Sequence, residues 1–457
     1  MAGAAVGAAG LDWLAPAIYP DPVDVDLVRS HWASALAPPL PPLGRSVDAD
    51  VVVVGGGLTG LATALHLCIQ APEQRVVLLE ARRCGNGASG RNGAMLLTMT
   101  PDRWLQPSAQ PALDRAILQL TSANIDALRS LAERFAVDVE LDVTGAVHAL
   151  CSPGEARAAQ EAAARLADAG LPVEYWGPER MRDELGTGAY SGALFDAASG
   201  QVHPGRLVAL LRHAAVTSGA EVYEGSCVVS IEEGATHVLH TAAGHRVRAP
   251  TLILATNAYS SQLGYLRNDY FPLTTHVGIT RPLDPETVAR LGWKCRAPFD
   301  DSLTREHWIG ITRDQRVRIG GGPHGYGYGF NNAPPASTVP VACAGALAAE
   351  LERLYPVLGS VEFERSWSGL VDCSLNMTPS VGRLGRHRNI YYAIGFSGHG
   401  VNLATLFGRV LADLVTGHDE RWRWLPYLNL RLPYVPNEPI RWLGTGAVEA
   451  ILALLRE

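Results

Sequence analysis

Three glycine-rich segments of the sequence could bind a nucleotide cofactor, and the first and third each stand between a predicted strand and a predicted helix. The first has the spacing Gly55-x-Gly57-x-x-Gly60. Glycines at this spacing permit a tight turn and a close backbone approach to a pyrophosphate at the start of a helix, where free N–H groups carry a partial positive charge. Glu80 follows at the end of the next strand, where a carboxylate accepts hydrogen bonds from a ribose. The pattern therefore predicts a bound dinucleotide.

The second segment, Gly87-Ala88-Ser89-Gly90-Arg91-Asn92-Gly93-Ala94, follows the strand that carries Glu80. Its small residues let the backbone approach a ligand, and Ser89, Arg91 and Asn92 offer hydrogen-bond donors. A flexible surface loop is the alternative interpretation. The position directly after that strand favours a second contact with the dinucleotide.

The third segment is Gly395-Phe396-Ser397-Gly398-His399-Gly400-Val401-Asn402. A helix that starts here could point its N-terminus at a developing negative charge, which in a reduced flavin lies at the N1–C2=O2 edge. His399 is therefore a catalytic candidate near the flavin, in a role other than proton transfer. The alternative is a histidine that caps its own turn.

Short apolar runs and helical periodicity must position these segments. The runs 51–54 and 75–80 predict buried strands around a helix that contains 61–67, which is a βαβ unit. Further helices are predicted at 105–135, 155–169, 204–219, 341–354 and 401–415, and further strands at 227–231, 236–240, 245–247, 252–255 and 391–394.

The dinucleotide-type segments stand at the start, middle and end of the chain, so we expect an α/β fold with a Rossmann-like domain that the chain leaves and re-enters. A mixed-sheet α+β substrate domain would occupy the intervening segments. The expected parts are an N-terminal arm that lies on the surface (1–47), a discontinuous FAD-binding domain (48–100, 200–260 and 365–420), a discontinuous substrate domain (101–199 and 261–364) and a C-terminal packing tail (421–457).

Composition excludes several classes of protein. The 457 residues are 47% hydrophobic and 18% charged with a net charge of −7, which argues against disorder and against a nucleic-acid-binding surface. The longest apolar runs are too short for a membrane span, and no basic residue precedes the first apolar stretch, so we expect a cytoplasmic protein without a signal peptide. The seven cysteines include no C-x-x-C pair, so no metal site is predicted and the thiols are expected to be reduced.

Taken with the segment Leu254-Ala255-Thr256-Asn257-Ala258-Tyr259, the three glycine-rich segments and Glu80 resemble the D-amino-acid oxidase (DAO) superfamily of FAD-dependent amine oxidoreductases. Within it the chain is most similar to gamma-glutamylputrescine oxidases and more distantly to sarcosine oxidases. The resemblance extends from about residue 45 to residue 417. Its motifs are specific for the superfamily and say little about the substrate.

The resemblance implies that FAD lies extended through the first domain, with its adenosine at Glu80, its pyrophosphate at Gly57 to Gly60 and its isoalloxazine facing 396–401. Substrate would lie between the isoalloxazine and the sheet of the second domain. The residues expected to bind FAD are Gly55, Gly57, Leu58, Thr59, Gly60, Glu80, Ala81, Arg82, Gly87, Ala88, Ser89, Arg91, Asn92, Gly93, Val228, Thr256, Gly395, Ser397, Gly398, His399, Gly400 and Val401.

Two departures from the related families bear on catalysis. Sarcosine oxidases use a lysine near the flavin for oxygen activation, and the corresponding strand here carries Arg318, which becomes the second catalytic candidate. Sarcosine oxidases also attach FAD through a cysteine shortly before a Thr-Pro pair. Cys373 precedes Thr378-Pro379, but the surrounding segment is more similar to gamma-glutamylputrescine oxidases, so we expect noncovalent FAD, with Cys373 the candidate if the link is covalent.

The implied reaction is oxidation of the C–N bond of a small amine or amino acid by hydride transfer to flavin N5, which gives an imine that hydrolyses. O2, reduced to H2O2, or another compound would accept the electrons. Arg281, Arg313 and Arg318 are candidates for binding a substrate carboxylate. One alternative is an FAD-dependent 2-hydroxy-acid or polyol dehydrogenase, with His399 or His276 as the base. A non-enzymatic alternative is a flavin-binding assembly or sensing subunit. The sequence does not indicate an oligomeric state.

Overall fold

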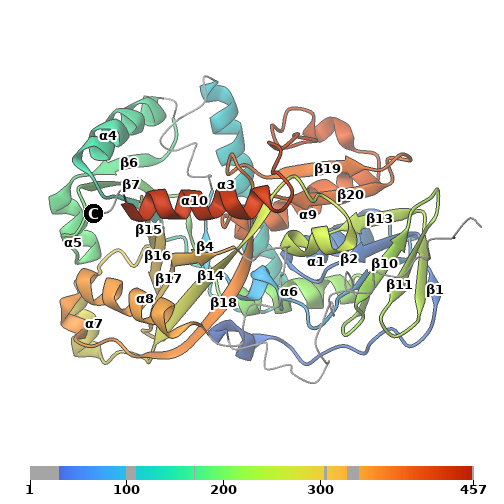
Figure 1. Ribbon diagram of the computed structural model, residues 1–457, viewed down its shortest axis with the longest axis horizontal. Helices are drawn as coiled ribbons and strands as arrows, with labels where there is room; N and C mark the ends of the chain where they lie inside the picture. Colours follow the sequence, from blue (N-terminus) through green and yellow to red (C-terminus); the bar gives the residue numbers. More distant parts are fainter. Residues whose placement is uncertain (1–29, 99–109, 169, 303–305, 327–338, 455–457) are drawn as a thin grey trace, which may run out of the picture.

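Two large sheets organise the chain, and they lie side by side (Figure 1). The structure is a computed structural model, and it describes residues 30–98, 110–168, 170–302, 306–326 and 339–454. A four-stranded sheet and a two-stranded ribbon complete the strand pairing within these ranges. The predicted α/β class is confirmed.

The six-stranded sheet contains the predicted βαβ unit. Its strands are parallel except for the antiparallel pair at one edge, β19 and β20. Every residue of β2 and β3 is buried, as expected for aliphatic strands that are covered on both faces. In sheet order the strands are β19 (Ser380–Leu384), β20 (Ile390–Ile394), β13 (Thr251–Leu254), β2 (Val51–Val54), β3 (Val76–Leu79) and β9 (Glu221–Tyr223).

Different layers cover the two faces of this sheet. Val51 and Val53 pack with α1 (Leu58–Gln70), α6 (Pro204–Thr217) and α9 (Gly400–Val415). Val52 and Val54 pack instead with the four-stranded sheet. That sheet consists of β1 (Val47–Asp48), β12 (Arg246–Ala249), β11 (His237–Thr241) and β10 (Val228–Glu232). The alternation along one strand therefore fixes both layers.

The eight-stranded sheet forms the other half of the molecule. Helices α4 (Pro153–Asp168), α5 (Pro178–Leu185), α7 (Pro285–Leu291) and α8 (Val341–Leu354) accompany it, and α3 (Pro111–Arg134) lies against α9. In sheet order the strands are β18 (Phe363–Cys373), β14 (Phe271–Thr280), β17 (Val317–Gly325), β16 (His307–Ile311), β15 (Phe299–Asp301), β5 (Ala146–Leu150), β7 (Gly192–Asp196) and β6 (Val173–Trp176).

Short elements connect these layers. The two-stranded ribbon pairs β4 (Met95–Leu96) with β8 (Gly200–Gln201). The 3-10 helices are η2 (His31–Ala35), η3 (Ala88–Gly90), η4 (Asn257–Leu263), η6 (Pro356–Leu358) and η7 (Asp419–Trp422).

The sheets divide the chain differently from the expected domains at two places. Residues 365–373, which we grouped with the FAD-binding segments, belong to β18 and pair with β14 in the larger sheet. The N-terminal arm is expected on the surface, yet Ser30 and Trp32 are buried; residues 1–29 of the arm lie outside the described ranges. The remaining domain division stays a proposal.

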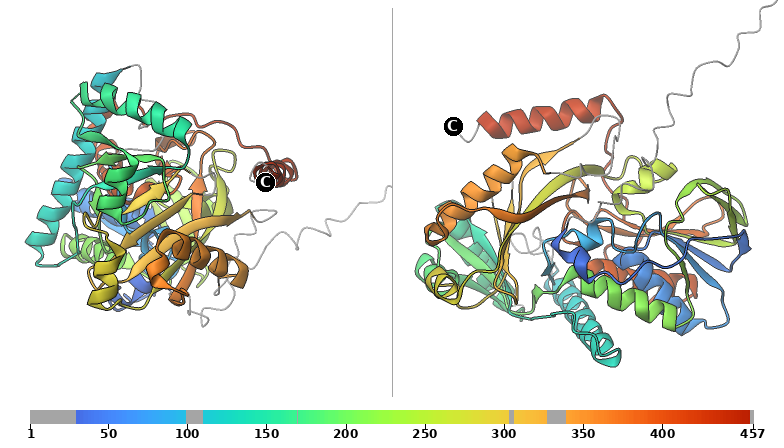
Figure 2. Two further views of the ribbon diagram at one scale, coloured as in Figure 1. Left: turned by 90° about the vertical axis from the view of Figure 1, so that its left-hand side faces the viewer. Right: turned by 90° about the horizontal axis from the view of Figure 1, so that it is seen from below.

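The C-terminal segment begins as a packed tail and ends in an exposed helix. The side chains of Trp422, Leu425 and Tyr427 are buried in the core that covers one face of the six-stranded sheet. Helix α10 (Ile440–Leu454) runs apart from the sheets in both views of Figure 2, and Trp442 and Leu443 near its start are exposed. Within the described part of the chain, no helix combines the length and apolar character that a membrane crossing requires.

Candidate active site

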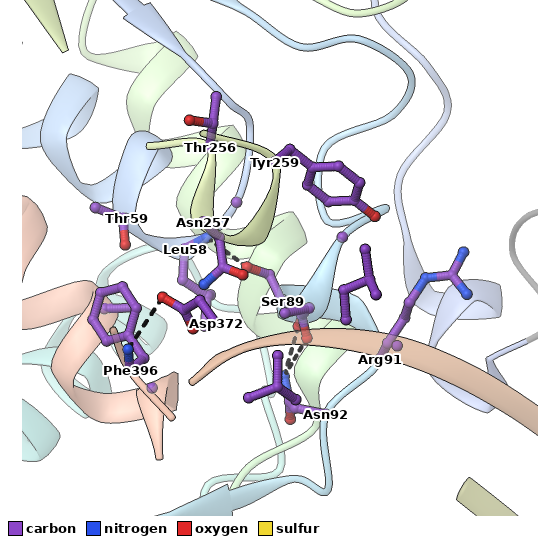
Figure 3. Close-up of a pocket in the computed structure, with 18 of the residues that line it drawn as sticks. Leu58, Thr59, Ser89, Arg91, Asn92, Thr256, Asn257, Tyr259, Asp372 and Phe396 are labelled. Carbon is purple, nitrogen blue, oxygen red and sulfur yellow. Dashed lines mark hydrogen bonds between the residues drawn. The ribbon is translucent and has the colours of Figure 1, made fainter. Parts of the chain in front are cut away.

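The turn between β2 and α1 forms a cradle of backbone N–H groups. Gly55 has a φ of 109°, and Gly57 caps the helix without a side chain. Ser89 Oγ accepts a hydrogen bond of 2.9 Å from Leu58 N, which ties this turn to the second glycine-rich segment (Figure 3). A Cβ at Gly57 would lie 2.8 Å from Ser89 Oγ, so the contact requires glycine. The cradle fits a pyrophosphate.

Glu80 closes the far end of this cradle. Its carboxylate accepts hydrogen bonds from Gly56 N at 2.7 Å and from Arg82 N at 2.9 Å. Burial raises the pKa of Glu80. These two bonds orient the carboxylate at the end of β3, where the oxygens can accept from ribose hydroxyl groups.

Residues 86–94, which we call the cofactor loop, are held by hydrogen bonds from distant elements. Arg91 donates to Asn86 O at 2.6 Å and to Ser368 O of β18 at 2.9 Å. Asn92 spans the turn, donating to Ser89 O and accepting from Ala94 N, both at 2.9 Å. The loop is therefore rigidly supported, which argues against a flexible surface loop.

Two buried tryptophans support the same loop from outside. Trp367 Nε1 donates to Arg91 O, and Trp32 Nε1 donates to Asn92 O, each at 2.9 Å. Ser30 Oγ also donates to Gly90 O at 2.7 Å. These contacts assign Trp367 to supporting the loop, and they explain why the end of the N-terminal arm is buried.

Asp372 fixes the turn that leads into α9. Its carboxylate accepts hydrogen bonds from Gly395 N at 2.6 Å and Phe396 N at 3.1 Å (Figure 3). Burial raises the pKa of Asp372 to about 6. Ser397 follows with a φ of 50°, and His399 Nδ1 lies 2.9 Å from Ser397 O, so this nitrogen donates. His399 thus bonds its own turn while its ring lines the cavity described next.

One cavity of about 460 Å³ connects these parts. The α1 turn, Glu80, the cofactor loop, Val228, Thr256 and the start of α9 line one side, and strands of the larger sheet line the other. The cavity brings together every residue expected to bind FAD except Gly60 and Gly395. These two glycines lie behind the lining residues and support their turns. A Cβ at Gly60 would collide with Gly55 O, and the backbone N–H of Gly395 donates a hydrogen bond to Asp372.

Arg318, expected beside the flavin, is not among the residues that line this cavity. It is fully buried behind the cofactor loop, where Nε donates to Gly93 O at 2.8 Å and a terminal nitrogen donates to Gln201 Oε1 at 3.1 Å. Burial lowers its pKa to about 9. These bonds support a positioning role.

The other candidates occupy distinct places. His276 is buried in β14, where Nδ1 lies 2.8 Å from Ser368 Oγ, and it is absent from the cavity lining. Cys373 lines the cavity, but burial raises the pKa of its thiol, as do the charges of Asp372 and Glu306. A thiolate at this position is therefore disfavoured.

Sequence reasoning placed a sheet of the second domain opposite the flavin but missed three residues that line the cavity there: Asp300, Glu306 and Trp308. His148, Asp300 and Trp308 stand opposite one another on β5, β15 and β16, so their side chains share one face. Glu306 precedes β16 and is two residues from Trp308, which indicates the same face. The alternation of side chains along residues 306–311 could have shown that Glu306 and Trp308 share a face of this strand. It could not have identified the neighbouring strands that bring Asp300 and His148 to the same face.

The hydrogen-bonding groups that line the cavity fit FAD. Backbone N–H groups at two helix N-termini suit the pyrophosphate and the flavin edge, and Glu80 suits the ribose. Asn86 Oδ1 is buried in the cavity wall, where none of the described residues donates a hydrogen bond to it, and it could accept one from a ligand.

Comparison with known proteins agrees with this geometry. Residues 50–414 match the family model described as DAO, FAD dependent oxidoreductase. The chain is 30% identical to gamma-glutamylputrescine oxidoreductase of Escherichia coli strain K12, covering 84% of this chain and 87% of that protein. It is 28% identical to the probable oxidoreductase OrdL of Haemophilus influenzae, covering 83% and 86% of the two chains.

A solved structure shows the same fold. Glycine oxidase from Geobacillus kaustophilus superimposes with a TM-score of 0.70 at 23% identity, covering 84% of this chain and 99% of that one. The family model spans the α1 turn, the cofactor loop and α9, all of which line the cavity. The chain therefore belongs to the DAO family of FAD-dependent oxidoreductases.

Proposed function

We propose that this enzyme oxidises the C–N bond of a small amine to an imine, which water then hydrolyses. The observation that supports this most strongly is the continuous cavity with an FAD-type cradle at one end and a sheet wall at the other. Relatives named gamma-glutamylputrescine oxidoreductase and glycine oxidase act on nitrogen compounds, which agrees with the proposal. When bound, FAD supplies the acceptor for the hydride that leaves the carbon next to nitrogen.

The chain's own residues position the reactants. The cofactor loop, held by Arg91, Asn92 and two tryptophans, would fix FAD along its length. The start of α9 presents its N-terminus to the cavity, and this partial positive charge would stabilise negative charge at the cofactor edge. We assign cofactor binding to the residues that line the cavity, and a positioning role to Arg318 through Gly93.

FAD is expected to be noncovalent, because the Cys373 thiol resists ionisation in its buried setting. Oxygen is the proposed electron acceptor, with hydrogen peroxide as the product. A peroxidase-coupled assay would follow that product. Reoxidation only by an added dye would instead identify a dehydrogenase.

The alternative hydroxy-acid dehydrogenase needs a base that reaches the alcohol. Of the two histidines considered, His399 lines the cavity and His276 does not. Anaerobic flavin bleaching by a panel of amines, amino acids and 2-hydroxy acids separates the two reactions. Bleaching by amines, faster at higher pH as they deprotonate, supports our proposal. Bleaching by hydroxy acids alone would contradict it, and bleaching by no compound would favour a non-enzymatic flavoprotein.

A further inference from the structure

The sheet wall of the cavity carries carboxyl groups beside an indole ring. Asp300 and Trp308 are cross-strand neighbours, and His148 on the other side of Asp300 places Nδ1 2.7 Å from Asp300 Oδ1. Glu306 lies close to both Asp300 and His399. One carboxylate oxygen from each acid and one ring nitrogen of His399 all lie within 4.8 Å of one another. All of these except His148 line the cavity.

The arginines that line the cavity lie on the opposite side from these carboxyl groups. Among the described residues that line the cavity, the arginines are Arg82 and Arg91, and both belong to the FAD side. The three arginines considered for a substrate carboxylate lie elsewhere. Arg281 is exposed, Arg313 pairs with Asp138 and Asp142, and Arg318 is bound to Gly93 and Gln201.

The two acids of this wall, Asp300 and Glu306, favour a cationic ligand over an anionic one. Only 6% of this residue is exposed, and burying a charge is costly unless it is paired. Asp300 Oδ1 is paired with His148, whose pKa the carboxylate of Asp300 raises to about 9 against the effect of burial, and Glu306 adds a second acid that becomes negatively charged as the pH rises through about 8. Trp308 offers an aromatic face beside the carboxyl groups, and carboxylates with an aromatic face are what an ammonium group prefers.

We propose that Asp300, Glu306 and Trp308 form the subsite for the substrate's ammonium group, and that Glu306 accepts its proton. This inference rests on the proposed function and specifies its substrate class: an aliphatic amine that carries no carboxylate on the reacting carbon. Asp300 would pair with the cation, and Trp308 would contact the adjacent methylene groups. An amino-acid carboxylate would be repelled by this wall.

The proton step balances without any redox change. The ammonium N–H bond breaks, its proton bonds to a Glu306 carboxylate oxygen, and the electron pair stays on nitrogen as the neutral amine. Burial and the charge of Asp300 raise the pKa of Glu306 to about 8, which makes it a stronger base than an ordinary carboxylate. The ionisable groups that face Glu306 are Asp300, Asp301, His148, His399 and Cys373.

A cation that cannot react separates binding from chemistry. Tert-butylammonium has no hydrogen on the carbon next to nitrogen, so it can occupy the subsite without reducing the flavin. We expect it to perturb the flavin spectrum of the oxidised holoenzyme and to bind more tightly as pH rises toward about 8, where Glu306 loses its proton. Binding that is absent or independent of pH would overturn the proposal, even if the variants below failed to fold.

Variants test the residues directly. Asp300→Asn and Glu306→Gln should weaken tert-butylammonium and butylamine binding at least tenfold while FAD content stays unchanged, and Glu306→Gln should remove the pH dependence near 8. Exposed Glu362→Gln is the matched control.

In the wild type, butylamine should bleach the flavin faster than glycine or alanine. Bleaching by amines with unchanged affinity in both variants, or preference for amino acids, would refute only this subsite. Bleaching by none of these compounds would refute the proposed function itself.

Discussion

The indole ring of Trp308, which belongs to the larger sheet, packs directly on the backbone of Gly93 in the cofactor loop. A Cβ at Gly93 would lie 2.6 Å from Cζ3 of Trp308, and a Cβ at Gly320 would also collide with the ring. Two glycines from different layers therefore both contact one tryptophan ring. Since Trp308 and Gly93 both line the cavity, this contact sets the separation between the FAD side and the sheet wall.

Gly93→Ala should displace Trp308 and widen the cavity at this contact. Inserting a methyl group into a packed contact costs about 1–3 kcal/mol, so we expect a lower midpoint of thermal unfolding and weaker amine binding. Gly44→Ala is the control, because a Cβ at Gly44 meets no atom within 4 Å. Equal behaviour of the two variants would show that Trp308 does not depend on Gly93.

Arg318→Met should destabilise the protein rather than act on oxygen chemistry. It leaves Gly93 O and Gln201 Oε1 without their arginine donor, and each buried polar group left unpaired costs about 1–3 kcal/mol. We expect easier unfolding and looser FAD, with the rate of flavin reoxidation by O2 changing less than FAD retention. Unchanged stability together with slow reoxidation would restore the catalytic assignment.

Local patterns predicted most of the residues that line the side of the cavity assigned to FAD, because these residues lie in short contiguous segments. Gly57 and His399 each stand in a glycine-rich turn between a strand and a helix, and Ser89 lies in the short 3-10 helix η3 that follows β3, so spacing alone indicates the backbone geometry. Spacing also placed Glu80 at the end of its strand. The supports of these turns, Trp32 above all, come from distant segments and have no local signal.

The sheet wall could not be predicted for the same reason. Asp300 and Trp308 become neighbours only through the pairing of β15 with β16, and His148 joins through the parallel pairing of β15 with β5, 152 residues away from Asp300 in the sequence. Arg318 was placed on its strand correctly, but its contacts depend on which loop packs over that strand. A homologous lysine position does not determine the contacts of an arginine, whose guanidinium is longer and makes several bonds.

Glu80→Ala should loosen FAD. A hydrogen bond to a charged group contributes about 1.5–3 kcal/mol, so we expect FAD to dissociate roughly tenfold to a hundredfold more readily. Fluorescence of released flavin measures this directly. The exposed Glu73→Ala is the control and should retain its colour. A wild-type protein that is colourless, ignores added FAD and binds NAD would contradict the cofactor assignment.

Cys373→Ala should leave the flavin as it is in the wild type. Because the buried thiol resists ionisation, we expect noncovalent FAD that acid precipitation releases into a yellow supernatant. A yellow wild-type pellet that turns white in the variant would demonstrate a covalent link through Cys373.

Glu306→Gln should change how stability depends on pH. The folded state raises the pKa of Glu306 from its ordinary value of 4.5 to about 8, so between these values it holds a proton that the unfolded chain has released. Raising pH through this window therefore lowers the free energy of unfolding of the wild type. The glutamine variant has no proton to lose here, so its curve should fall less.

We expect the two curves to diverge by about 1–3 kcal/mol between roughly pH 5 and pH 8, since a unit of pKa shift corresponds to about 1.4 kcal/mol and partial solvent contact reduces it. Urea unfolding at saturating FAD measures both curves, and other ionisable groups cancel largely in their difference. Glu362→Gln should follow the wild type, because its side chain is exposed. Parallel curves for the wild type and Glu306→Gln would show that Glu306 is already ionised at neutral pH, and Glu306 would then be too weak a base to take a proton from the substrate's ammonium group.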